Sequence, residues 1–77
     1  MSRLRLVAFS TLAKVAEAKG FYRIRQEGSH NIFRSAEGKI IVIPNHGSQV
    51  IVRPLLRKIL RDMGVSPDEY EAILKKL

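Results

Sequence analysis

The chain of 77 residues contains no cysteine, and acidic residues are scarce. Without cysteine it can form no disulfide, whereas a secreted domain of this size usually needs several. A structural zinc site needs several soft ligands, and only His30 and His46 could offer them. No segment approaches the roughly 20 apolar residues of a membrane span. The first apolar stretch is interrupted at Ser10-Thr11 and Lys14, which is not typical of a signal peptide. We therefore expect a cytoplasmic protein, stabilised by its apolar core, without metal or cofactor.

The short length predicts a single domain, residues 1–77, with a thin core. Such a domain has little room for a deep cavity, which favours a large substrate in a shallow groove. Charge is unevenly distributed along the chain. Residues 1–61 hold 12 basic and three acidic residues, a net charge of +9, against +7 for the whole chain. A basic body attracts polyanions. Nucleic acid is the first candidate partner, with an anionic protein as the alternative.

The first half of the chain predicts a helix followed by three strands. Residues 12–19 are rich in helix formers, with Ser10 or Thr11 as the cap and Gly20 at the end. Strand-like runs occupy residues 21–26, 29–34 and 39–43. Glu27-Gly28 joins the first two runs, and residues 35–38 join the next two, so we expect two successive antiparallel hairpins.

Side chains alternate between the two faces of a strand, which predicts how each run is oriented. The third run is apolar on both faces, a pattern compatible with the best covered strand but not sufficient to prove it. In the second run one face carries His30, Ile32 and Arg34. In the first run, one face is expected to carry Tyr22, Ile24 and Gln26, and the other Phe21, Arg23 and Arg25.

The second half predicts two helices. Pro44 ends the sheet because it has no N–H to donate. After a polar loop, a helix is expected from about Arg53 to Met63, with Gly64 closing it. A capping box at residues 66–69 starts a last short helix. The order helix, three-stranded meander, helix, short helix predicts an α+β domain with helices on one sheet face. The other face would stay uncovered, and function could reside there.

The residues that could carry chemistry are few. Residues 1–61 have no cluster of acids to hold magnesium, and Ser29 and His30 point to opposite faces, so they form no nucleophile–base pair. A histidine exchanges protons near neutral pH, and RNA supplies its own 2′-hydroxyl nucleophile. His30 or His46, beside cations that neutralise a phosphate, could therefore cleave RNA without metal. A solvated or packing histidine is the alternative at this point. The available cations are Arg23, Arg25, Arg34 and Lys39.

Four segments together resemble the HicA family of mRNA-interferase toxins, also called YcfA-like proteins. They are Gly20-Phe21, residues 25–34 with Gly28-Ser29-His30, residues 42–47 with Ile43-Pro44-Asn45-His46, and residues 55–65. The resemblance covers residues 10–66. Residues 49–54 depart from it, because they lack the acidic residue, small residue and glycine that members commonly have there. We expect the loop or its antitoxin contact to differ accordingly.

The resemblance implies a fold like a double-stranded-RNA-binding domain and an endoribonuclease activity that cleaves mRNA and halts translation. It implies that His30 is catalytic and that the partners are RNA and a HicB-like antitoxin. Gly28 would let the hairpin turn and a nucleotide approach. Ser29 could donate to a phosphate, and His46 could protonate the leaving oxygen. Two alternatives remain: a non-catalytic RNA-binding domain, which needs cations but no histidine, and a protein-interaction module that uses residues 50–52.

Overall fold

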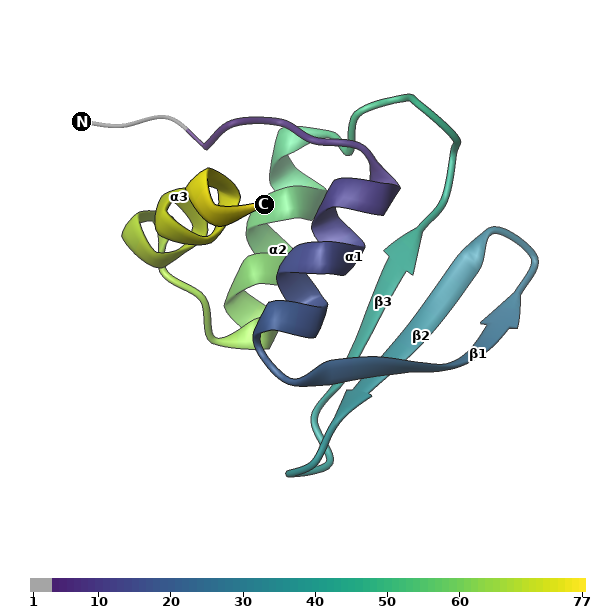
Figure 1. Cartoon of the computed structure of the whole chain (residues 1–77). Helices are drawn as coiled ribbons and strands as arrows, with labels where there is room; N and C mark the ends of the chain where they lie inside the picture. The colour runs from purple at the N-terminus through teal and green to yellow at the C-terminus, as the bar shows by residue number, and fades with distance from the viewer. Residues whose placement is uncertain (1–3) are drawn as a thin grey trace.

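The computed structural model describes residues 4–77 and places α-helices on one side of a three-stranded sheet (Figure 1). The strands are antiparallel, in the order β1-β2-β3. Helices α1 and α2 pack against the sheet, and α3 packs on α1. The predicted α+β order and its double-stranded-RNA-binding-domain-like layout are confirmed. The elements are α1 (Phe9–Ala18), β1 (Phe21–Glu27), β2 (His30–Ser35), β3 (Ile40–Pro44), α2 (Arg53–Met63) and α3 (Pro67–Lys76).

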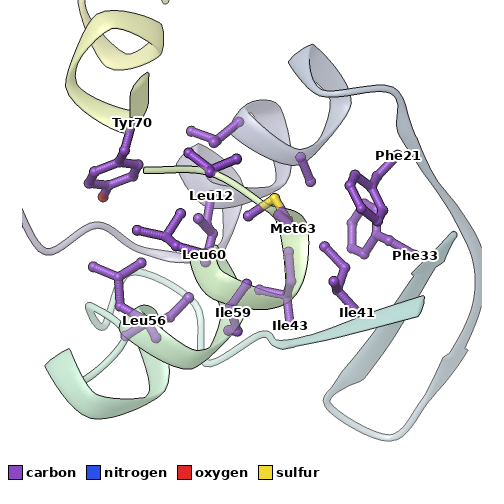
Figure 2. Packing of buried hydrophobic residues seen from close by; sticks show 14 of the residues in the cluster. Leu12, Phe21, Phe33, Ile41, Ile43, Leu56, Ile59, Leu60, Met63 and Tyr70 are labelled. Carbon is purple, nitrogen blue, oxygen red and sulfur yellow. The ribbon is translucent and has the colours of Figure 1, made fainter. Parts of the chain in front are cut away.

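The apolar core fills the space between the sheet and the helices (Figure 2). One face of the sheet and the apolar stripes of α1 and α2 supply most of its buried side chains, which removes their apolar surface from water. Among residues 4–77, no helix lies over the opposite face of the sheet (Figure 1). The strand side chains in the core are Phe21, Phe33, Ile41 and Ile43, and those from the two helices include Leu12, Val15, Leu56, Ile59 and Met63.

The ends of α2 and the start of α3 agree with the sequence prediction because their signals are local. Helix α2 has Pro54 in its first turn and ends at Gly64, whose φ of 77° is left-handed. Glycine adopts this conformation without a steric penalty. At the start of α3, the Glu69 N–H donates to Ser66 Oγ at 3.1 Å, as the capping box predicts. None of the helices within residues 4–77 is long and apolar enough to cross a membrane.

The predicted cap of α1 is wrong. The helix begins at Phe9, two residues before Thr11, and its N-cap is Ala8, with no side-chain hydrogen bond. Ala8 forms an isolated antiparallel bridge with Val50, and the Ile51 N–H donates to the Val7 carbonyl at 2.9 Å. This distant segment fixes the extended backbone just before Phe9, so the helix starts there.

The segment before α1 is also tied to α3 and α2. The Tyr70 hydroxyl donates to the Arg5 carbonyl at 2.5 Å, and Arg53 Nη1 donates to the Leu4 carbonyl at 2.6 Å. Arg5 forms an ion pair with Glu71 at 2.8 Å. The Tyr70 ring is fully buried in the core (Figure 2). Burial raises the pKa of Tyr70 to about 12; Arg5 opposes this shift and Glu71 adds to it.

Two features of the sheet differ from the sequence prediction. The turn between β1 and β2 is Gly28-Ser29, one residue later than expected. Strand β1 also contains a bulge at Ile24, because Arg23 pairs with Phe33 whereas Arg25 pairs with Ile32. The bulge reverses the alternation, so Arg25 lies on the face of Ile32, opposite to Arg23. The prediction that Arg23 and Arg25 share a face is therefore wrong, and so is the grouping of Gln26 with Tyr22.

The best covered strand is β2, in the centre of the sheet, rather than the more apolar β3. Strand β3 lies at an edge, where Ile40 and Val42 are exposed. Buried side chains of β2 include a polar one, Asn31, which has no exposed surface. Asn31 Nδ2 donates to the Ser29 carbonyl at 3.3 Å, and its Oδ1 accepts from Arg23 Nη1 at 3.1 Å. A buried amide with both groups bonded helps to specify one arrangement of the hairpin.

We predict that Tyr70→Phe lowers the free energy of unfolding by about 1 kcal/mol at pH 7, because the Arg5 carbonyl loses its donor. The folded pKa of Tyr70, about 12, lies above the usual value of 10. The hydroxyl therefore contributes fully below pH 10, and its contribution is lost as the pH rises through 12. Denaturant unfolding of both proteins at several pH values checks this. A stability difference that stays constant up to pH 12 would contradict it.

We predict that Asn31→Ala lowers the free energy of unfolding by about 1–3 kcal/mol, because a buried amide and both its hydrogen bonds are lost. Arg23→Ala should cost less, since Arg23 is exposed and its removal leaves the bond to Ser29 in place. Chemical denaturation of the two single variants and the double variant measures their coupling. If the two single variants lose equal free energies of unfolding, and these losses add in the double variant, the Asn31 bonds to Ser29 and Arg23 contribute nothing specific.

Candidate functional site

The uncovered side of the sheet, here called the open face, consists of three rows of side chains. Each row runs across the three strands, because paired residues in neighbouring strands point to the same side. Successive rows lie about 7 Å apart along β2. From the β1–β2 turn outward, the rows are Glu27-His30-Pro44, then Arg25-Ile32-Val42, then Tyr22-Arg34-Ile40.

His30 begins β2 and is exposed at the end of the sheet. In its row it lies between Glu27 of β1 and Pro44 of β3. Since directly paired side chains lie about 5 Å apart at Cβ, the Glu27 carboxylate is a near neighbour of the imidazole. His30 is thus accessible to a large substrate, with an acidic and an apolar neighbour.

The turn before His30 is fixed from two sides. Its Ser29 carbonyl accepts the Asn45 N–H at 2.7 Å and Asn31 Nδ2 at 3.3 Å. Gly28 has a φ of 59°, and no other turn residue has a positive φ, which is the pattern of a type II′ turn. A Cβ at Gly28 would meet nothing within 4 Å, so the outer side of the turn is open. The expected role of Gly28 in the turn is confirmed.

A groove of about 280 Å³ lies between β3 and α2, and His30 is part of its wall. Its charged groups are Lys58 and Asp62, whose side chains form an ion pair at 2.7 Å. Lys58 was not among the site residues expected from the sequence. No local signal could have found it, because its position depends on how α2 packs beside β3. The apolar walls of the groove are formed by Ile40, Ile41, Val42, Pro44, Leu55 and Ile59.

The structure brings only two of the four expected cations onto the face of His30. Arg25 and Arg34 lie on the open face, and Arg25 Nε forms an ion pair with Glu27 at 2.7 Å. Arg23 lies on the helix side and donates to Asn31. Lys39 lies in the β2–β3 loop, at the other end of β2, near the C-terminal end of α2. The expected grouping of Arg23 and Lys39 with His30 is not observed.

His46 lies at the same end of the sheet as His30. It follows Pro44, the partner of His30, by two residues, so the backbone separation from Pro44 is at most about 7 Å. The His46 side chain is exposed, and the His46 backbone carbonyl accepts the Gln49 N–H at 3.3 Å in a turn. Both histidines can therefore reach a substrate at this end of the open face.

Sequence reasoning also missed Glu27 as a site residue. It placed Glu27 in the turn, whereas the turn is one residue later and Glu27 pairs with His30. The signal was present, since a glycine at the first position of a two-residue turn puts the flanking residues opposite each other. Within residues 4–77, no three His, Asp or Glu side chains lie close enough to share a metal ion.

Comparison with known proteins gives one match to a family. No curated protein matches the chain. A family model described as HicA toxin of bacterial toxin–antitoxin matches residues 9–65. The matched region runs from the start of α1 to just beyond α2 and includes the sheet, the Gly28-Ser29 turn and both histidines. Because the match covers most of the chain, this protein belongs to the HicA toxin family of bacterial toxin–antitoxin systems.

Proposed function

We propose that this toxin is an endoribonuclease that cleaves mRNA without a metal, with His30 as the general base. The observation that carries the proposal is the position of His30. It is exposed at the end of the open face, and it borders a groove that also holds a lysine. A metabolite-sized substrate would need a deeper pocket. An extended, anionic polymer suits a shallow basic surface better, and blocking translation would account for a toxin's effect.

In the proposed reaction, His30 takes the proton of a ribose 2′-hydroxyl. The 2′-oxygen forms a bond to the adjacent phosphorus, and the bond from phosphorus to the 5′-oxygen breaks. The 5′-oxygen receives a proton from His46, or from a water molecule that regains its proton from the protonated His30. The products are a 2′,3′-cyclic phosphate and a 5′-hydroxyl, and no water is consumed. His46 fits the role of acid because it lies at the same end of the sheet.

Two cations near His30 are suited to neutralise the developing charge on the phosphate. Lys58 lines the same groove, and Arg25 lies in the next row of the open face. Each is held by a carboxylate at 2.7 Å, Asp62 for Lys58 and Glu27 for Arg25. Both pairs are largely exposed, so exchanging a carboxylate for a phosphate costs little. Ser29 can donate its hydroxyl to the same phosphate.

The partner in this proposal is a HicB-like antitoxin that covers the open face. Val50 and Val52, beside the start of α2, are 51% and 61% exposed and offer an apolar contact to such a partner. Ile51 between them is buried. The run at residues 50–52 therefore presents two side chains to a partner rather than three.

We predict that His30→Ala lowers the rate of RNA cleavage by about 10²–10⁴-fold, the usual contribution of a general base. The variant should fold normally, because substitutions at exposed positions usually change stability by less than about 0.5 kcal/mol. The measurement uses a long single-stranded RNA in EDTA and identifies the product ends. His46→Ala tests the proposed acid and should lose less activity, because water can protonate the leaving oxygen in its place.

Three outcomes distinguish the alternatives. Loss of cleavage in His30→Ala, with 2′,3′-cyclic phosphate ends from the wild type, supports the proposal. RNA binding by both proteins without cleavage would instead identify a non-catalytic RNA-binding domain. Cleavage that requires a divalent ion, or that survives His30→Ala, would overturn the assigned mechanism.

We predict that Lys58→Ala lowers cleavage by about tenfold, which corresponds to about 1.4 kcal/mol of transition-state stabilisation. Lys75→Ala is the matched control, because Lys75 is an exposed lysine at the end of α3, outside the groove. Both variants lose one positive charge, so a general charge effect would lower their activities equally. Single-turnover kinetics at fixed ionic strength measures the difference, and equal losses would remove Lys58 from the site.

A further inference from the structure

The far row of the open face, Tyr22-Arg34-Ile40, is not used by the proposed reaction. Its members are paired across the sheet, and all three are exposed. Tyr22 is 50% exposed, although an aromatic ring is costly to leave in water. Its ring has no aromatic partner within residues 4–77, and its hydroxyl forms no hydrogen bond with another of these residues. The ring is therefore available to a ligand.

Charge on the open face favours a polyanion as that ligand. Arg34 lies beside Tyr22 and has no carboxylate partner among the residues that the structure describes. The only acidic side chain in the three rows is Glu27, which is paired with Arg25. An apolar protein partner would gain little from an unpaired arginine, whereas a nucleic acid would place a phosphate on it and a base on the ring.

We propose that Tyr22 is a base-stacking subsite for the same RNA strand whose scissile phosphate lies at His30. This inference rests on the proposed function. An RNA strand along β2 would pass from His30 over the middle row to Tyr22. Arg34 would neutralise a backbone phosphate there, and the Tyr22 ring would stack on an unpaired base. Stacking is tolerant of base identity, so Tyr22 contributes affinity and fixes the position of the strand.

The separation of the two positions gives this subsite a measurable signature. His30 and Arg34 are four residues apart on β2, which is about 13 Å. A substrate of two nucleotides at His30 is too short to reach Tyr22, whereas a longer strand reaches it. The subsite therefore acts on long substrates only, and through binding rather than through the chemical step.

The kinetic test compares Tyr22→Ala and Tyr22→Phe on a dinucleotide and on a single-stranded 12-nucleotide RNA. Tyr22→Ala should lower kcat/KM on the longer RNA by roughly ten- to hundredfold, mostly through KM. It should leave dinucleotide cleavage unchanged, and Tyr22→Phe should behave like the wild type because the ring is retained. The matched control is Leu77→Ala, an exposed apolar residue outside the three rows. Equal losses on both substrates, or no loss on either, would overturn the subsite.

A binding test separates failure of the subsite from failure of the nuclease proposal. The chain has no tryptophan and two tyrosines, of which Tyr70 is buried. In His30→Ala, stacking of a base on Tyr22 should quench tyrosine fluorescence, and Tyr22→Phe in that background should abolish the quenching. Quenching in the absence of any cleavage by the wild type would support the subsite and overturn the proposed nuclease activity. RNA binding without quenching, or no RNA binding, would overturn the subsite.

Discussion

The turn at Gly28-Ser29 sets the register of β2, and the core and the candidate site both depend on that register. Successive side chains of a strand point to opposite faces, so a slip by one residue would exchange the two faces. His30 would then face the helices, and Phe33 would leave the core. Such a slip is opposed by the burial of Phe33 and by the two hydrogen bonds of Asn31, both of which it would break. The position of His30 on the open face is therefore fixed by residues that face away from it.

The small size of the chain explains why one face of the sheet remains uncovered. Two helices are enough to cover one side of a three-stranded sheet, and α3 packs on α1 instead of covering the other side. The open face is consequently free for a long substrate, with His30 at one end and Tyr22 at the other. The bulge at Ile24 adds Arg25 to this face by reversing the alternation of β1. Catalysis and substrate binding would thus occupy different rows of one surface, which allows each to be altered separately.

Much of the fold could be predicted because its signals are local. Pro54 and Gly64 delimit α2 through their own backbone preferences, and the predicted bounds of that helix are confirmed. The start of α1 could not be predicted, since Ala8 is held by the bridge to Val50, 42 positions away in the chain. The bulge in β1 could not be predicted either, because a bulge is defined by the pairing with the neighbouring strand and not by the residues that form it.

The sequence by itself determined the α+β order, the basic charge, the resemblance through Gly28-Ser29-His30, and an uncovered sheet face. These properties depend on composition, periodicity and short spacings, which the amino-acid sequence contains directly. Only the tertiary structure decided which cations accompany His30. Arg23 lies on the helix side, Lys39 lies at the far end of β2, and Lys58 lines the groove. The reason is that these distances depend on strand register and on the packing of α2 against β3, which arise from contacts between residues far apart in sequence.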